Sequence, residues 1–352
     1  MLNLLRSLFT SSSSESINAR SKLNQPAPEE VSVDGLEPFW IGKHISWHNG
    51  LPIMDWDAVQ AWVGKAEVSL QNDAWTACER AWLLQLRDAL GVDYVLTESG
   101  GASLLSSLEP NLSRATLEYM DRTLRRVAKV LDGIAHTPEW GKDILIVFDD
   151  DESYYNYVSY YYPEEGGEFA LSGGMHISAG CSHFVTVKSD LRTVEPVIAH
   201  EMTHGCLSHL PIPLWLNEGL AVNTEHRLVG KGSTLYTPHE MQIKHLAFWG
   251  EDEIQEFWSG KSFHRPDDGN LLSYDLARII VEQIAKDWDS FKQFVLNANW
   301  QDGGTKSAAD HLHLHLGEMV CALLEKPEEC AWEPDPTKWD QEIPIDELAT
   351  KP

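Results

Sequence analysis

The most constraining feature of the sequence is a pair of helix-forming segments with very little chain between them. The first, TVEPVIAHEMTHGCL, runs from Thr193 to Leu207, and the second, PLWLNEGLAVNTEH, runs from Pro213 to His226. Pro211 and Pro213 stop the first segment, whereas a proline is well tolerated in the first turn of the second. We therefore expect two helices that are joined by a short turn and can face each other.

The first of these helices carries an HExxH pattern at His200, Glu201 and His204. Residues four apart lie one turn above each other on the same helix face, so both imidazoles can reach one zinc ion at roughly 2.0–2.1 Å. Glu201 projects to the side of that face, where it can contact water rather than the metal. The same five-residue pattern also occurs by chance in ordinary helices.

The second helix makes the pattern more specific because it places Glu218 one turn after its start. Two histidines and one glutamate form a three-ligand zinc site that leaves the fourth position for water. The sequence thus predicts a zinc centre at His200, His204 and Glu218. Glu201 is expected to act as the general base that takes a proton from water and later returns it to the leaving amine.

HEMTH followed by WLNEGLA resembles the gluzincin branch of the zinc peptidases, which includes thermolysin and the aminopeptidase N-like family. The strongest likeness covers roughly residues 180–230, and WLNEG is especially similar to the aminopeptidases. Thirteen residues, 205 to 217, separate His204 from Glu218, fewer than those aminopeptidases use. Their GAMEN-type exopeptidase motif is missing, and the nearest string, GGMHI at 173–177, lacks its Glu. The resemblance implies a compact zinc metallopeptidase, with exo- or endopeptidase activity left open.

The resemblance also implies a supporting acid for one zinc ligand. A ligating histidine needs its second ring nitrogen held by an acceptor. Glu225 lies seven residues after Glu218 and matches an acid of the aminopeptidase-like pattern, whereas Val222 occupies the thermolysin-like position. A solvent-facing helix acid is the alternative interpretation of Glu225.

The reaction further needs a donor for the negative charge that grows on the carbonyl oxygen. Related enzymes often supply a Tyr or His from the helical subdomain, and Tyr274 in NLLSYDLA has a similar placement. His264 and Arg265 are weaker candidates for the same role. Tyr274 could instead be a packing residue at a helix start.

Other metal patterns fit less well. A metzincin needs Gly and His at the places that Leu207 and Leu210 occupy, and His209 is off that register. In the run His311–His315 only the two end residues would share a helix face, which makes a second metal site unfavourable. The acids 149–152 lack EF-hand spacing and read as the solvated end of a strand.

Charge and cysteine content limit the partners. The chain has 54 acidic and 27 basic residues, a formal net charge of −27 that repels nucleic-acid phosphates. No apolar run is long enough to cross a bilayer, and the apolar start of the chain is broken by Arg6. The five cysteines form no CxxC pair and read as reduced thiols. We expect a cytoplasmic protein that binds a peptide or protein substrate.

Periodicity indicates the flanking elements. Apolar spacing predicts helices over 55–66, 73–90 and 117–134, and later over 273–288 and 306–325. Strands are expected at 93–99, 143–150 and 183–187. The Tyr-rich run at 154–162 reads as core and surface aromatics on a strand or loop.

The predicted fold class is α+β, with a zincin-like catalytic core of a small mixed sheet and active-site helices, followed by a mainly helical subdomain. The expected organisation is a disordered segment (1–34), a helical region (35–92), the catalytic subdomain (93–230), the helical subdomain (231–325) and an acidic Pro-rich tail (326–352). Two alternatives to a peptidase remain: a zincin-like binding or regulatory protein with little turnover, and a non-peptide hydrolase. The intact Glu201 favours an enzyme, because a pure binder needs no general base.

Overall fold

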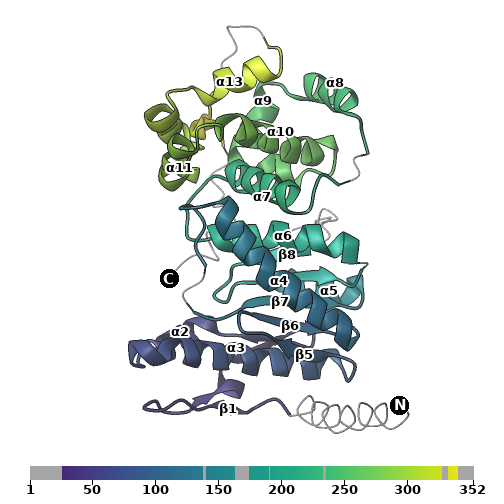
Figure 1. The fold of residues 1–352 in the computed structure, drawn as a ribbon, viewed down its shortest axis with the longest axis vertical. Helices are drawn as coiled ribbons and strands as arrows, with labels where there is room; N and C mark the ends of the chain where they lie inside the picture. Colours follow the sequence, from purple (N-terminus) through teal and green to yellow (C-terminus); the bar gives the residue numbers. More distant parts are fainter. Residues whose placement is uncertain are drawn as a thin grey trace, which may run out of the picture. The chain divides into compact units, whose positions relative to one another are not determined.

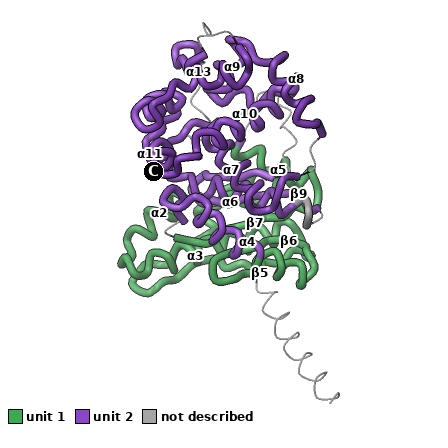
Figure 2. The backbone as a smooth tube through the Cα atoms, turned by 45° about the horizontal axis from the view of Figure 1, so that its top comes forward, with its two compact units in different colours: residues 1–118, 139–161, 352 green, residues 119–138, 162–351 purple. Residues whose placement is uncertain are grey.

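The chain divides into two compact units, which Figure 2 shows in different colours. The computed structural model describes residues 26–137, 140–162, 174–189, 191–232, 235–326 and 332–339. Unit 1 comprises residues 1–118 and 139–161 together with residue 352, and unit 2 comprises residues 119–138 and 162–351. Figure 1 labels the helices and strands of both units. Helices and strands are both present, so the expected α+β class is confirmed.

Unit 1 begins with short strands that the sequence interpretation did not anticipate. Strands β1 (Glu30–Val31) and β2 (Phe39–Trp40) pair antiparallel, and the 3-10 turn η1 (Ile41–Lys43) follows. Strands β3 (Ile45–His48) and β4 (Leu51–Met54) then form a hairpin. Its turn residues, Asn49 and Gly50, have φ values of 49° and 80°. Asn-Gly suits a two-residue hairpin turn because both residues tolerate positive φ.

Helices α2 (Trp56–Val63) and α3 (Val68–Leu90) confirm the two helices expected between 55 and 90. The Asp55 side chain caps α2 by accepting the backbone N–H of Ala58 at 3.0 Å. Their apolar faces bury Trp56, Trp75 and Trp82. The indole N–H of Trp82 donates to a backbone oxygen of β4 at 3.1 Å, which fixes α3 against the hairpin.

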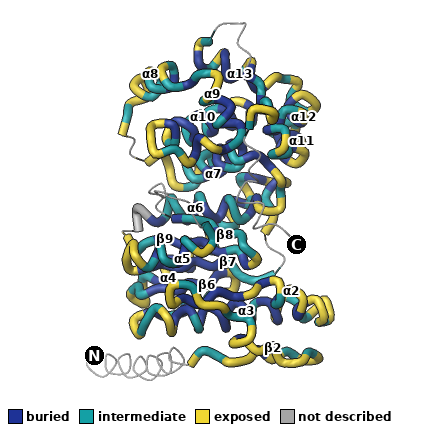
Figure 3. The backbone as a smooth tube through the Cα atoms, turned by 180° about the vertical axis from the view of Figure 1, so that it is seen from behind, coloured by how far each residue is buried: buried dark blue, intermediate teal, exposed yellow. Residues whose placement is uncertain are grey.

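Three strands of unit 1 lie side by side in the order β5 (Val95–Glu98), β6 (Ala102–Ser106) and β7 (Asp143–Phe148). β5 pairs antiparallel with β6, whereas β6 pairs parallel with β7, so the strand arrangement is mixed as expected. β6 is buried throughout and β7 nearly so, as the dark blue strands in Figure 3 show. β5 and β7 confirm two predicted strands, and β6 was not predicted.

The Tyr-rich run is helical, so its interpretation as a strand or loop was wrong. It forms α5 (Asp151–Tyr161), in which Tyr154, Tyr157 and Val158 are buried and Tyr160 is exposed. That spacing of three to four residues is the period of a helix that packs on one face. The acids Asp151 and Glu152 lie in its first turn, where negative charge favours the helix dipole.

Helix α4 (Pro110–Val130) begins in unit 1 and continues into unit 2 from Tyr119 onward. Its buried face includes Leu117, Met120 and Val127, which confirms the predicted amphipathic helix. In unit 2, strands β8 (Gly174–Ile177) and β9 (His183–Val187) pair antiparallel. β9 is the strand expected at 183–187.

Helices α6 (Leu191–Leu207) and α7 (Leu214–Leu228) are the two motif-bearing helices that the sequence predicted. The rest of unit 2 is mainly helical. Its elements are α8 (Pro238–Phe248), α9 (Glu251–Ser259), η2 (Lys261–His264), α10 (Asp268–Ile284), α11 (Trp288–Asn297), η3 (Trp300–Asp302), α12 (Thr305–Ser307), the short π-helix η4 (Ala308–Leu312) and α13 (Leu316–Leu323). Trp215 lies at the centre of their core, against Trp258, Phe257 and Phe294. The single helix expected over 306–325 is wrong, because the backbone turns left-handed at His313 with a φ of 54°.

Part of the expected C-terminal tail is packed. Residues 332–339, which include the 3-10 helix η5 (Pro336–Lys338), lie against α9 and α13, and Trp332 is 7% exposed within the core of unit 2.

Cys321 is disulfide-bonded, so the expectation that all five cysteines are reduced thiols was wrong for this residue. Cys78, Cys181 and Cys206 are buried and form no disulfide. Among the described helices, none is long and apolar enough to cross a membrane.

Candidate metal centre

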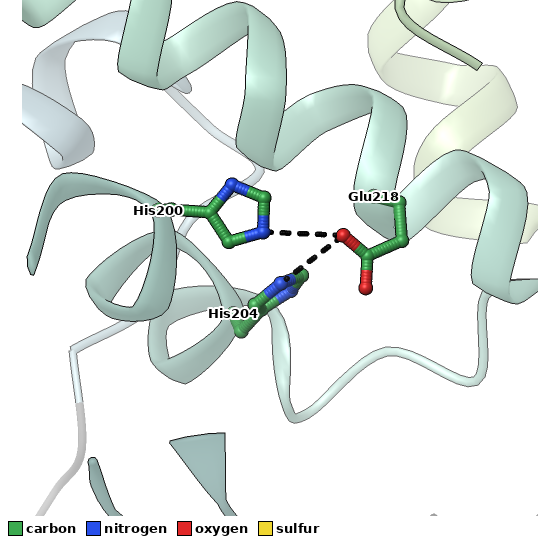
Figure 4. Close-up of side chains that lie close together, drawn as sticks. All are labelled: His200, His204 and Glu218. Atoms are coloured by element: carbon green, nitrogen blue, oxygen red, sulfur yellow. Dashed lines mark hydrogen bonds and ion pairs between the residues drawn. The ribbon is translucent and has the colours of Figure 1, made fainter. Parts of the chain in front are cut away.

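Helices α6 and α7 bring the HExxH histidines and Glu218 together, as Figure 4 shows. Successive turns of α6 carry His200 and His204, whose rings are 4.7 Å apart and nearly perpendicular. Pro213 precedes α7 in an extended conformation, so the chain reverses and α7 begins at Leu214. Glu218 then lies one turn into α7 and points back at the two imidazoles.

The three side chains converge on one point through their ligand atoms. Oε2 of Glu218 lies 3.2 Å from Nε2 of His200 and 3.5 Å from Nε2 of His204. The ligand atoms of all three residues lie within 4.8 Å of one another. Within the described part of the chain, this is the group of His, Cys, Asp or Glu side chains that could hold a metal ion.

The outer nitrogens of both rings are held by acceptors on α7. Nδ1 of His200 lies 3.3 Å from Oε2 of Glu225, and Nδ1 of His204 lies 3.0 Å from Oδ1 of Asn217. Each Nδ1–H therefore donates outward, which leaves the Nε2 lone pair of each neutral ring facing the centre. Glu225 occupies the place that the sequence predicted for it. Asn217 was missed, although it stands directly before Glu218.

The centre is buried and attracts positive charge. Glu218 is 8% exposed. Burial opposes its ionisation, but the charge of His204 and the hydrogen bonds of both imidazoles hold its pKa well below the ordinary value. Burial likewise opposes protonation of His200, yet Glu218 and Glu225 raise its pKa well above the ordinary value. The pKa of His204 is also raised, against burial, by the charge and hydrogen bond of Glu218. A cation at this point can replace those protons.

Glu201 lies beside the three ligand residues but is not one of them. It is 8% exposed. Burial is the main cause that raises the pKa of its carboxyl above the ordinary value, and the nearby charge of Glu218 adds to the effect. A carboxyl whose pKa is raised towards neutrality can accept a proton and return it, as general acid–base chemistry requires.

Tyr274 on α10 belongs to the same site. Its ring centroid lies 6.4 Å from that of His200, and its ring packs edge-on against Phe263 at 5.2 Å. The negative charge of Glu218, burial and the charge of Glu201 raise its pKa well above the ordinary value. The hydroxyl therefore keeps its proton and can donate a hydrogen bond near the ligand group.

The weaker candidates are placed elsewhere. Arg265 binds Glu256 at 2.6 Å and Asp267 at 2.7 Å, which occupies its guanidinium. His209 is exposed and stacks on His136 with a centroid distance of 4.1 Å. His311 lies in the short π-helix η4, and Nδ1 of His315 lies 3.9 Å from Oε1 of Glu333.

His176 is a site neighbour that sequence reasoning missed. Its Nε2 lies 2.7 Å from Oγ of Ser182 and its Nδ1 lies 3.2 Å from Oγ of Ser178. A Cβ at Gly205 would lie 3.4 Å from Nε2 of His176, so the ring sits against α6 directly after His204. Burial, then the charges of His204 and His183, lowers the pKa of His176 to about 3.

No protein-family model matches this chain, and no curated protein matches its sequence.

Proposed function

We propose that this protein is a zinc-dependent hydrolase, most specifically a gluzincin-type metallopeptidase with a zincin-like catalytic core. The observation that carries the proposal is the convergence of Nε2 of His200, Nε2 of His204 and Oε2 of Glu218, with the carboxyl of Glu201 beside them. The resemblance of HEMTH and WLNEG to gluzincin peptidases supports the same reaction.

The donor set fits zinc. Two neutral imidazole nitrogens and one carboxylate oxygen are the ligands of a catalytic zinc site with an open fourth position. The bonds from Nδ1 of His200 to Glu225 and from Nδ1 of His204 to Asn217 orient both rings for this purpose. When bound, zinc acts as a Lewis acid and lowers the pKa of water towards neutrality.

The chain's own residues perform the proton transfers. Glu201 accepts a proton from the attacking water on its carboxylate, and then delivers it to the amine that leaves the peptide. The backbone of His176 acts against burial to lower the pKa of that carboxyl, which favours the charged form that accepts the proton. The Tyr274 hydroxyl donates a hydrogen bond towards the carbonyl oxygen as negative charge develops there.

Two other functions compete with this proposal. A zincin-like binding or regulatory protein would hold the metal with little turnover, and a non-peptide hydrolase would use the same centre on esters or other amides. The buried Glu201 with its raised pKa favours turnover, because holding a metal does not require it. A peptide bond, in a peptide or protein substrate, is the target that the gluzincin-like motifs favour.

The test combines metal analysis with Glu201→Gln. We expect one zinc per chain in the wild type and in the variant, and cleavage of a mixed-sequence, internally quenched peptide library by the wild type alone. The variant should lose at least about a hundredfold in rate, since it keeps the size of Glu201 but cannot accept the proton. Glu195→Gln, on the same helix, is the matched control and should retain activity.

Four outcomes would overturn parts of the proposal. Chelator-free protein without stoichiometric zinc removes the metal centre. Zinc-loaded protein that cleaves esters but no peptide favours the non-peptide hydrolase, and zinc-loaded protein that cleaves neither favours the binding protein. A Glu201→Gln variant that cleaves peptides at the wild-type rate places the base elsewhere.

A further inference from the structure

Asn223 joins the helix that carries Glu218 to the helix that carries Tyr274. Its side-chain Nδ2 donates to the backbone oxygen of Gly219 at 2.8 Å, within α7, and to the backbone oxygen of Arg278 at 2.9 Å, on α10. A carboxamide has two N–H donors, and both are used here. The residue therefore joins α10 to α7, and both of these hydrogen bonds go to backbone oxygens rather than to the proposed metal ligands.

Gly219 allows the backbones of α7 and α10 to approach each other closely. A Cβ at position 219 would lie 2.6 Å from the backbone oxygen of Ala277 and 2.6 Å from Cγ2 of Val281. Real Cβ atoms do not approach backbone that closely, so any larger residue would push α10 away. The two helix backbones are consequently in close contact at Gly219, directly after Glu218.

The contacts lie next to the groups that the reaction uses. Gly219 follows Glu218 immediately, and Arg278 lies one helical turn after Tyr274. The ring centroid of Tyr274 lies 6.4 Å from that of His200, so the tyrosine lies beside the ligand group. A shift of α10 along or away from α7 therefore moves Tyr274 relative to Glu218.

We propose that Asn223 is a positioning residue, which sets the location of the Tyr274 hydroxyl at the metal centre by binding the backbones of α7 and α10. The inference rests on the proposed hydrolase function and adds a residue to its machinery. Asn223 contacts no reacting atom and acts through Tyr274. A residue with only a structural role would instead affect the protein equally whether or not residue 274 carries a hydroxyl.

A double-mutant cycle separates these two roles. The four proteins are the wild type, Asn223→Ala, Tyr274→Phe and the double variant, measured on one quenched peptide that the wild type cleaves. We expect Asn223→Ala to lower kcat about tenfold with KM nearly unchanged, because a misplaced donor weakens transition-state stabilisation. In the Tyr274→Phe background the same substitution should change kcat less than about twofold, which is the coupling expected of residues that act together.

Asn297→Ala is the matched control. Asn297 on α11 makes the same bond to the carbonyl four residues earlier, with Nδ2 2.9 Å from the Gln293 oxygen. Because this bond stays within one helix, its loss should leave kcat unchanged. Asn223→Asp, which keeps the shape and removes the N–H donors, replaces Asn223→Ala if the latter does not fold.

A second readout does not depend on turnover. With 3-fluorotyrosine at position 274, Asn223→Ala should shift or broaden the fluorine resonance of the zinc-loaded protein. An equal loss of kcat in both backgrounds, no loss in either, or an unchanged fluorine resonance would each overturn the positioning role. If the zinc-loaded wild type cleaves no peptide, the proposed peptidase function fails, and the fluorine measurement still decides the placement of Tyr274.

Discussion

Oε2 of Glu225 lies 3.3 Å from Nδ1 of His200, on the opposite edge of the ring from Glu218. In the neutral ring the Nδ1–H donates to Glu225, so the lone pair lies on Nε2, which faces Glu218 and His204. The charge of Glu225 also makes the imidazole a better donor to a cation. The ligand geometry at His200 therefore depends on a residue seven positions after Glu218.

Removing this acceptor should weaken metal binding. We expect Glu225→Ala to lower zinc affinity about 10- to 100-fold, and Glu225→Gln to fall between the wild type and the Ala variant, since its amide oxygen still accepts the hydrogen bond. Competition with a chromophoric chelator measures the affinity. Glu318→Ala, an exposed acid on α13, is the control and should bind zinc like the wild type. Equal zinc affinity in the wild type and Glu225→Ala would show that Glu225 does not support the ligand.

The stability of the metal-free protein should fall as the pH rises above neutrality. The raised pKa values of His200 and His204 mean that their protons stabilise the fold fully below the ordinary value of 6.5, and that this stabilisation is lost as the pH rises through the raised values. The pKa of Glu218 is lowered, so its contribution is present above the ordinary value of 4.5 and lost as the pH falls through the lowered value. The metal-free fold should thus be most stable at mildly acidic pH.

Zinc reverses this dependence at the centre, because it requires unprotonated imidazoles and binds more tightly as the pH rises. The difference in Tm between zinc-loaded and metal-free protein should widen between about pH 6 and pH 8. Thermal unfolding with and without zinc measures it, and His200→Ala should show almost no zinc-dependent difference at either pH. A difference that narrows with rising pH contradicts the assignment of the raised pKa values to the ligand histidines.

The convergence of His200, His204 and Glu218 was predictable because their arrangement is largely local. His200 and His204 share a helix face by spacing alone. The prolines at 211 and 213 indicate that the first helix ends there and that the chain reverses direction, which turns Glu218 back towards the histidines. Asn217 was not predictable in the same way. Its contact with His204 depends on how α7 is rotated where it meets α6, which the sequence spacing does not specify.

His176 illustrates the limit more clearly, since it comes from a strand distant in sequence. Its ring lies against Gly205, directly after His204, only through the packing of β8 beside α6. The missed fold elements have local causes. The hairpin of β3 and β4 is marked by Asn49-Gly50, a strong turn signal. The tyrosines of α5 suggested β structure because tyrosine favours strands. The acidic, Pro-rich composition near residues 332–339 predicted an unpacked tail, whereas Trp332 is buried.

The packed C-terminal segment should contribute measurable stability through Gln255 on α9. The carboxamide of Gln255 donates to the backbone oxygen of Glu333 at 2.8 Å and accepts from Asp335 N at 2.9 Å and Trp339 Nε1 at 3.1 Å. Gln255→Ala leaves these groups without their partner and should lower the free energy of unfolding by roughly 2–3 kcal/mol. Denaturant unfolding measures the change.

Gln293→Ala, at an exposed position of α11, is the control for this effect and should stay within about 0.5 kcal/mol of the wild type. Zinc content should be unchanged in both variants, because the described residues show no hydrogen bond between Gln255 and His200, His204 or Glu218. A Gln255→Ala protein as stable as the wild type would mean that the hydrogen bonds of Gln255 to residues 333–339 do not stabilise the fold.

Removing the Tyr274 hydroxyl should slow turnover without disturbing the metal. The raised pKa of Tyr274 keeps its hydroxyl protonated, and the 6.4 Å separation of its ring from that of His200 places it beside the ligand group. A donor aimed at a developing oxyanion typically contributes about a hundredfold or more to kcat. Tyr274→Phe retains the ring that packs against Phe263, so zinc content and Tm should remain close to those of the wild type.

Tyr236→Phe, which preserves a ring beneath Lys244 outside the ligand group, is the matched control and should leave kcat unchanged. A Tyr274→Phe protein with wild-type kcat would leave Tyr274 as a packing residue, whereas a rise in KM alone would assign its hydroxyl to substrate binding rather than to the transition state.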